Sequence, residues 1–280
     1  MKYRTNRRVV AAVLISTAVT TLAACGPAGT GADSKSSADA GGPSPSTPGP
    51  GDSFDSLSGP QISEKIKSAL RRTTSVRLTG DLPQPGTGAG GTFTVDITMD
   101  TTGACRGTIA MPGAGVLNLI KGRGNYFVQG DERYWRTSLA AGKNKPSAQK
   151  VDAFLPKVKD RWLKVNEKTA KAFASSSMCD LSAITKQIER SSPGDVERGA
   201  DVTRDGQELA VIYDRSGNEV TTAYVSKGAR PYLVELTSTG GTAPVNVKFT
   251  DYGKPVDTTP PPAAQIITPE KLGLVPNRRA

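Results

Sequence analysis

The clearest structural signal in the chain is the stretch Thr92-Phe93-Thr94-Val95-Asp96-Ile97-Thr98-Met99-Asp100, in which apolar and polar residues alternate without a break. Successive side chains of a β-strand point to opposite faces of the sheet. The pattern therefore predicts a strand with one solvated face and one buried face, the latter formed by Phe93, Val95, Ile97 and Met99. These four residues meet either the side chains of helices or an open cavity, and the function depends on which.

Further strand candidates follow in two groups along the chain. The first group begins with Val76 and Leu78 and continues at residues 106–111, 116–121, 125–129 and 133–137, with Gly-rich turns between the segments. The second group lies at residues 196–203, 208–214, 220–226, 232–238 and 245–252, joined by short turns such as Asp205-Gly206 and Lys227-Gly228. Strands joined by such short turns pair as antiparallel neighbours.

Helical spacing of apolar residues marks the segments between and before these strands. Ser58-Gly59-Pro60 is typical of a helix start, and apolar residues then recur at helical spacing up to Arg72, namely Ile62, Ile66, Ala69 and Leu70. Two further helices are predicted at residues 167–175 and 181–190. This order of elements indicates an α+β fold, with helices on one face of a large antiparallel sheet.

Residues 1–24 have the layout of a secretory signal peptide. Four basic residues come first, and the uncharged run from Val9 to Leu22 follows, too short to span a bilayer. Leu22-Ala23-Ala24-Cys25 then resembles the lipobox of bacterial lipoproteins, in which the cysteine thiol is lipidated and cleavage makes that cysteine the new N-terminus. The alternative is an ordinary signal peptide with an incidental cysteine.

The lipobox resemblance implies a membrane anchor. Cys25 would carry a diacylglycerol with acyl chains such as palmitate, and two acyl chains hold a protein stably on a membrane whereas one does so only marginally. No other stretch reaches the ~18 consecutive apolar residues that a membrane helix needs. We therefore expect a protein on the outer face of the cell membrane, with the rest of the mature chain outside the cytosol.

Composition divides the mature chain into a tether and a domain. Residues 26–53 contain no Val, Ile, Leu, Met or aromatic residue and consist mainly of Gly, Pro, Ser, Ala and Thr. Such a segment cannot bury a core. We therefore predict a lipidated cysteine and disordered tether over residues 25–56, a folded domain over residues 57–268, and a C-terminal tail over residues 269–280.

Positive charge is concentrated in one stretch. The formal net charge is +10, and loss of the four basic residues of the signal peptide leaves 10 − 4 = +6. The basic patch consists of Lys143, Lys145, Lys150, Lys157, Lys159, Arg161, Lys164, Lys168 and Lys171. It either contacts anionic lipid headgroups or an anionic envelope polymer, or is merely a solvated face. We expect no nucleic-acid partner.

The sequence contains no histidine. This absence removes the commonest general base, the commonest zinc ligand and any Ser-His or Cys-His catalytic pair. No metal-ligand spacing is visible in the sequence, so we expect no metal, no cofactor and no enzymatic activity. With Cys25 lipidated, Cys105 and Cys179 remain as an even pair in an oxidising compartment, which predicts a disulfide.

Several short motifs occur in an order that resembles the LppX/LprG group of envelope lipoproteins, relatives of the lipoprotein carrier LolA. Besides the lipobox and tether, they are Thr74-Ser75-Val76-Arg77-Leu78-Thr79-Gly80, Gly124-Asn125-Tyr126-Phe127, Arg161-Trp162, Arg230-Pro231-Tyr232 and Phe249-Thr250-Asp251-Tyr252-Gly253-Lys254-Pro255-Val256. The resemblance covers about residues 57–267 and implies a LolA-like half β-barrel, a large curved antiparallel sheet over a few helices. In some members its apolar cavity holds a lipid or glycolipid. The cysteine pair and the basic stretch depart from the family pattern.

Two functional hypotheses follow. The leading one is a lipid-anchored lipoprotein that binds a lipid or other amphiphile in an apolar cavity, for transport or presentation, without covalent chemistry. Trp135 and Trp162 either line this cavity or belong to a packed core, and with Phe93, Val95, Ile97 and Met99 they are the candidate cavity residues. The alternative is an envelope interaction or sensor lipoprotein whose basic patch recruits a polyanion or a protein partner.

Overall fold

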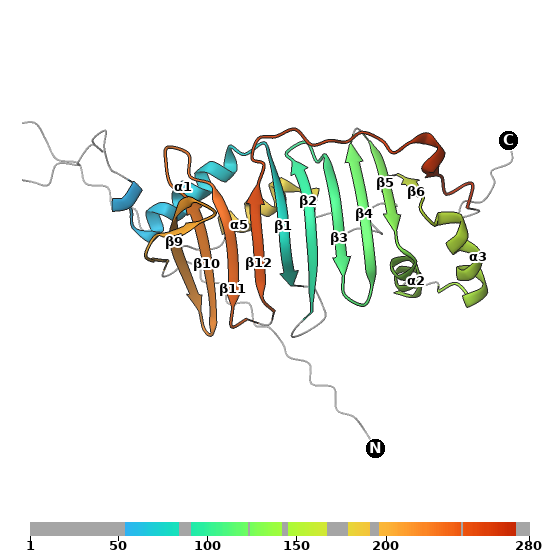
Figure 1. The fold of residues 1–280 in the computed structure, drawn as a ribbon, viewed down its shortest axis with the longest axis horizontal. Coiled ribbons are helices and arrows are strands. Elements are labelled where there is room, and N and C mark those ends of the chain that lie inside the picture. The colour runs from blue at the N-terminus through green and yellow to red at the C-terminus, as the bar shows by residue number, and fades with distance from the viewer. Residues whose placement is uncertain are drawn as a thin grey trace, which may run out of the picture. The chain divides into compact units, whose positions relative to one another are not determined.

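The alternating stretch forms strand β2 (Thr92–Asp100), near the middle of one large sheet (Figure 1). Phe93 is 9% exposed, and Val95, Ile97 and Met99 are at most 1% exposed. Thr94 and Asp96 on the other face are exposed. The predicted division into a buried and a solvated face is therefore confirmed.

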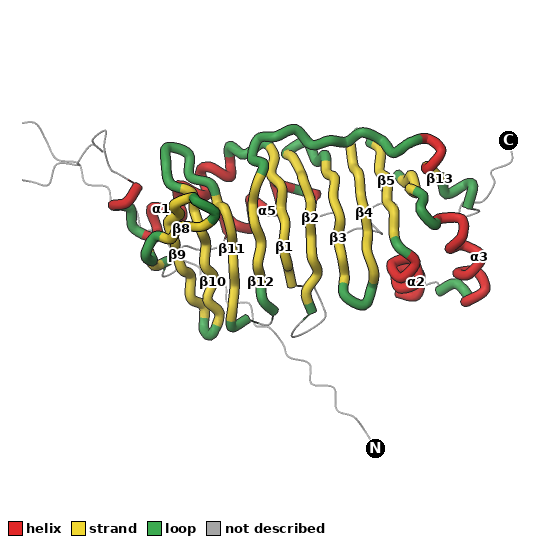
Figure 2. Tube along the Cα trace, viewed as in Figure 1, coloured by secondary structure: helices red, strands yellow, loops and turns green. Residues whose placement is uncertain are grey.

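The computed structural model describes residues 54–83, 91–122, 124–141, 145–166, 179–190, 196–241 and 243–272, all within one unit that spans Pro48–Ala280. Its strands, shown in yellow in Figure 2, are β1 (Ser75–Pro83), β2, β3 (Cys105–Met111), β4 (Gly115–Gly122), β5 (Asn125–Gly130), β6 (Trp162–Val165), β7 (Glu197–Arg198), β8 (Val202–Arg204), β9 (Gln207–Ser216), β10 (Glu219–Ser226), β11 (Leu233–Thr239), β12 (Val245–Thr250) and β13 (Ile266–Ile267).

The two predicted groups of strands form a single sheet because β12 pairs with β1. Along the described residues the strand order is β13-β6-β5-β4-β3-β2-β1-β12-β11-β10-β9-β7, with β8 paired to β9. All of these pairs are antiparallel except β13 with β6. The sheet is thus large and not closed into a barrel, which is consistent with the predicted α+β class. It is mixed rather than entirely antiparallel, because β13 pairs parallel with β6. The finer half-barrel geometry stays a prediction from the family resemblance.

Helix α1 (Gly59–Arg71) begins where the sequence predicted. The backbone N–H of Ser58 donates to Oε1 of Gln61 at 2.8 Å, which stabilises the first turn. Its apolar stripe, namely Ile62, Ile66, Ala69 and Leu70, is buried. Helix α5 (Leu181–Arg190), also predicted, lies on the same side of the sheet as α1 (Figure 1).

The predicted strand at residues 133–137 is wrong, because this segment belongs to helix α2 (Glu132–Ala141). Tyr134 and Trp135 favour strands, but the carboxylate of Asp131 accepts a hydrogen bond from the backbone N–H of Tyr134 at 2.6 Å and starts a helix instead. Helix α3 (Ala148–Val158) was not predicted. Both helices lie at the β5 and β6 end of the sheet (Figure 1).

Other predicted segments have different outcomes. The strand predicted at residues 196–203 is divided into β7 and β8. The helix predicted at residues 167–175 lies outside the described residues, as do Cys25 and residues 26–53 of the tether. Short 3-10 turns, η1 (Phe54–Ser56) and η3 (Ala263–Gln265), lie near the two ends of the described chain.

The segment after β12 runs along one end of the strands to the far edge of the sheet, shown in dark red in Figure 1. Nη1 of Arg106 on β3 lies 2.8 Å from a carboxylate oxygen of Asp257 in this segment. The segment ends in η3 and β13, and Ile266 and Ile267 pair with Trp162 and Leu163 of β6. It therefore connects the middle of the sheet to one edge.

Candidate functional site

A cavity of about 490 Å³ lies between the sheet and the helices α1 and α5 and is partly open to solvent. Its walls are mostly apolar. The described residues that line it are Ser63, Ile66, Lys67, Leu78, Leu82, Ile184, Ile188, Val196, Ile212, Tyr213, Asp214, Thr221, Ala223, Leu233, Leu236, Val247 and Phe249.

The sheet wall of this cavity contains a row of cross-strand partners with little bulk at one position. Ile212 pairs with Ala223, Ala223 with Leu236, Leu236 with Val247, and Val247 with Gly80. Directly opposed residues project from the same face of a sheet. Because Ala223 lines the cavity with only a methyl group, it leaves space beneath the helices that a larger residue would fill. Gly80 does not line the cavity, and a Cβ at this position would instead meet the backbone oxygen of Asn246 on β12.

The helical wall is formed by residues at helical spacing. On α1, Ile66 and Lys67 lie three and four positions after Ser63, and on α5, Ile188 lies four positions after Ile184. Each set therefore projects from one face of its helix. The two helices are also joined at their surface, where Nη1 of Arg71 lies 3.4 Å from a carboxylate oxygen of Glu189.

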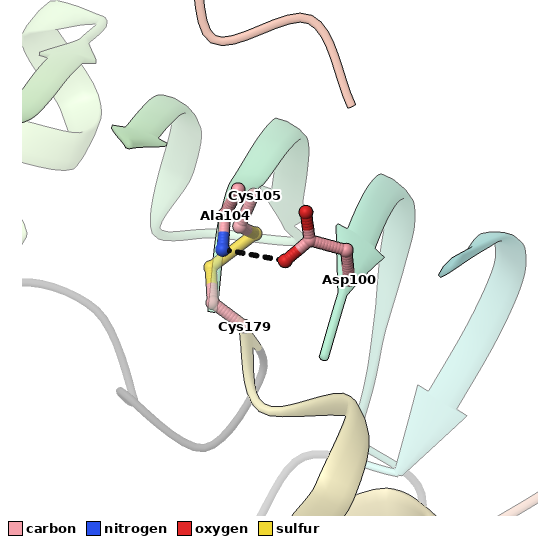
Figure 3. Close-up of a disulfide and its surroundings, with 4 residues drawn as sticks. All are labelled: Asp100, Ala104, Cys105 and Cys179. Carbon is pink, nitrogen blue, oxygen red and sulfur yellow. Dashed lines mark hydrogen bonds between the residues drawn. A yellow bond between two sulfur atoms is a disulfide. The ribbon is translucent and has the colours of Figure 1, made fainter. Parts of the chain in front are cut away.

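The predicted disulfide between Cys105 and Cys179 is present and connects β3 to the segment directly before α5, two residues ahead of Leu181 (Figure 3). The two Cα atoms are 5.4 Å apart and 74 residues apart in the sequence. One oxygen of the Asp100 carboxylate accepts hydrogen bonds from the backbone N–H groups of Thr102 and Ala104, at 2.8 and 2.9 Å, and so fixes the turn that leads to Cys105 (Figure 3). The disulfide therefore holds the start of α5 against the sheet.

Two charged residues line the cavity. Lys67 has a side chain only 9% exposed, and its Nζ lies 3.2 Å from Oε1 of Glu64, whose side chain is 60% exposed. Asp214, on β9 at the opposite wall, is partly exposed and pairs across the strands with Thr221. The cavity thus combines apolar walls with a few polar groups, as ligand sites commonly do.

The six candidate cavity residues from the sequence lie elsewhere. Phe93, Val95, Ile97 and Met99 are buried on β2, and none of them is among the described residues that line this cavity. Trp135 lines a separate cavity of about 610 Å³ beside α2 and α3, and its ring packs edge-on against Tyr134 and Phe154. Trp162 lines a smaller one of about 360 Å³ beside η3. The structure therefore does not bring the six together in one site.

The cavity residues that the sequence analysis missed come from α1, α5, β1 and the second group of strands. Their site exists only because β12 pairs with β1, which no local pattern reveals. One signal was available. Lys67 lies four residues after Ser63 and three before Leu70, so helical spacing places this lysine beside the apolar stripe of α1.

The described part of the basic patch lies on and around α3 and β6. Lys145, Lys150, Lys157, Lys159, Arg161 and Lys164 are all exposed. Within the described residues none of these six forms an ion pair. The neighbouring carboxylate of Asp152 on α3 pairs with Arg136 instead, at 2.9 Å. Lys143, Lys168 and Lys171 lie outside the described residues.

A further small cavity, of about 310 Å³, lies at the C-terminal end of α1, where Arg72 and Arg230 line it together with Tyr232 and Tyr252. The two tyrosine rings stack with their centroids 4.4 Å apart, and the hydroxyl of Tyr252 donates to the carbonyl oxygen of Leu233 at 2.6 Å. Burial raises the pKa of Tyr252 above its ordinary value. This phenol is therefore neutral at physiological pH.

The residues that the structure describes include no group of three or more His, Cys, Asp or Glu side chains that could hold a metal ion. None of the described helices is long and apolar enough to cross a membrane.

No protein-family model and no curated protein matches the chain. Among solved structures, LprF from Mycobacterium bovis matches with a TM-score of 0.47 and 11% identity, over 72% of this chain and 96% of that chain. The lipoprotein LppX of Mycobacterium tuberculosis matches with a TM-score of 0.41 and 12% identity, over 70% and 95%. A lipoprotein-sorting domain from Vibrio parahaemolyticus matches with a TM-score of 0.18 and 10% identity, over 70% and 95%. LppX gives its name to the group that the sequence motifs resemble.

Proposed function

We propose that the protein is a lipid-anchored extracytoplasmic lipoprotein whose cavity between α1, α5 and the sheet binds a lipid or other amphiphile, for transport or presentation and without covalent chemistry. The observation that carries this proposal is the partly open, mostly apolar cavity of about 490 Å³. Small-molecule sites are typically roughly 300–1,000 Å³ and are lined mainly by apolar residues with a few polar groups.

The cavity leaves part of its apolar lining accessible rather than packed. Protein interiors are normally packed as densely as organic crystals, because every gap forfeits van der Waals contacts. Leu82, Ile184 and Leu236 face the cavity from three different elements and are each partly exposed. An acyl chain among them would restore these contacts and would itself leave water, gaining about 25 cal/mol for each Å² of apolar surface buried.

The start of the domain lies at the same half of the sheet as the cavity. Nη1 of Arg198 donates to the carbonyl oxygens of Phe54 and Leu57, at 3.0 and 2.8 Å. Nζ of Lys227 lies 2.7 Å from a carboxylate oxygen of Asp55. These contacts fix the first described residues of the domain beside β7 and the end of β10, and α1 leads from them to the cavity.

Fluorescence titration tests the proposal. The mature chain without its lipid, residues 26–280, is titrated with N-phenyl-naphthylamine, a neutral probe whose emission rises in apolar sites. We expect saturable binding at one probe per protein and displacement by long-chain amphiphiles. A protein that gives no saturable signal does not offer an apolar site, and the proposal then fails.

The alternative hypothesis has one supporting observation of its own. The six described lysine and arginine residues of the basic patch are exposed and not ion-paired with any described residue, so they are free to attract an anionic envelope polymer. Failure of the probe titration, together with salt-sensitive binding to such a polymer, would favour this alternative.

A further inference from the structure

Lys67 is an unusual component of an apolar cavity wall. Lysine is among the residues least often fully buried, yet this side chain is 9% exposed and faces the cavity between Ser63 and the apolar residues of α5 and the sheet. An ammonium group can donate three hydrogen bonds. Among the described residues, its one ion-pair partner is Glu64, at 3.2 Å.

Filling the cavity changes the surroundings of this charge. An amphiphile displaces water from the wall, and a cation that loses water without gaining an acceptor is costly. Glu64 is 60% exposed and Asp214 is partly exposed, so both carboxylates keep contact with solvent. The buried ammonium is therefore the group whose hydration a neutral ligand would remove without replacement.

We infer that the amphiphile has an anionic head group, a carboxylate or a phosphate, which Lys67 holds through a charge-assisted hydrogen bond. A cationic head would instead place a second positive charge beside Nζ. The apolar chain of the ligand would lie along Leu82, Ile184 and Leu236, which line the same cavity and are partly exposed. This inference rests on the proposed function, and it adds the chemical class of the ligand to it.

The test compares ligands that differ only in the head group. Palmitic acid, hexadecyl phosphate and methyl palmitate each displace N-phenyl-naphthylamine from the mature chain, residues 26–280, at about pH 8, where both acids are ionised. Lys67→Met removes the charge and keeps a flexible side chain of similar length. Lys65→Met makes the same change at an exposed position of the same helix and serves as the matched control.

The unmodified protein and Lys65→Met should bind at least one of the two anions about tenfold to a hundredfold more tightly than the ester, as expected for one charge-assisted hydrogen bond. An advantage for only one anion identifies the head group. Lys67→Met should lose the advantage, and a cooperative thermal unfolding transition like that of the unmodified protein shows that it is folded. Equal affinity of the unmodified protein for all three ligands, or an advantage that persists in Lys67→Met, overturns the inference and leaves the proposed function standing. Displacement by none of the three refutes both.

Discussion

Replacing Ala223 by tryptophan should block the cavity without destabilising the fold. Ala223 lies on β10, lines the cavity, and has Ile212 and Leu236 as its cross-strand neighbours. An indole at this position would project into the cavity of about 490 Å³. Half of its surface, about 100 Å², would leave water, worth on the order of 2 kcal/mol, and lost rotamer freedom would offset about half of that gain.

The same substitution at Val95 is the matched contrast. Val95 is 1% exposed on β2 and does not line the cavity. Overpacking a filled core costs typically 1–3 kcal/mol and sometimes more. We therefore expect Val95→Trp to lower the melting temperature by about 2–12 °C, given about 2–4 °C per kcal/mol for a domain of this size. Ala223→Trp should leave it unchanged or raise it by about 2–4 °C.

Thermal unfolding followed by circular dichroism measures the stabilities, and titration with N-phenyl-naphthylamine measures the cavity. Ala223→Trp should keep the melting temperature of the unmodified protein. Its affinity for the probe should fall at least about tenfold, because the indole and the probe cannot occupy the same site. If Ala223→Trp is as unstable as Val95→Trp, the space is a packed core. If it binds the probe as well as the unmodified protein does, the ligand site lies elsewhere.

Three further predictions concern the anchor, the disulfide and a surface ion pair. Cys25→Ser should move the protein from the membrane fraction to the soluble fraction or leave it unprocessed, whereas processed protein that still sediments with membranes in high salt would rule out the lipobox. The double substitution Cys105→Ala and Cys179→Ala should lower the free energy of unfolding by about 4 kcal/mol for a loop of this length, or the melting temperature by about 8–16 °C. Two reactive thiols in the unsubstituted protein, denatured without a reducing agent, would show that the bond is not formed. Hydrogen bonds from Arg77, at 2.7 and 2.8 Å, lower the pKa of Asp96. The ion pair therefore stabilises the protein at pH values above the ordinary Asp pKa. This contribution is lost as the pH falls through the lowered pKa. Asp96→Asn should accordingly cost about 0.5 kcal/mol at about pH 7 and nothing at about pH 2, and an equal cost at both pH values in urea unfolding would exclude this explanation.

Local patterns predicted the elements whose residues are close together in the sequence. The alternation in β2 and the start signal before α1 are such patterns, and both elements formed as expected. Residues 133–137 were mistaken for a strand because the helix there depends on a cap from Asp131, and Oδ2 of the same side chain also accepts a hydrogen bond from the backbone N–H of Val116. Strand propensity is weak enough for such a contact to override it.

The candidate site could not be predicted because it is built from distant parts of the chain. Ile66, Ile184, Ala223 and Val247 come together only after β12 has paired with β1 and the disulfide has placed α5. In the sequence the cavity residues look like any other apolar residues of amphipathic helices and strands. Burial of Phe93 to Met99 was predicted correctly, but burial alone does not distinguish a packed core from the wall of a cavity.

The central claim, that the cavity holds an amphiphile, is tested most directly by native mass spectrometry. The lipidated protein is released from membranes of its native host by a mild detergent, and its mass is compared with that of Ala223→Trp prepared in the same way. The account predicts a mass increment of one amphiphile per protein that is absent from Ala223→Trp. Equal masses, apart from the substitution itself, would contradict it.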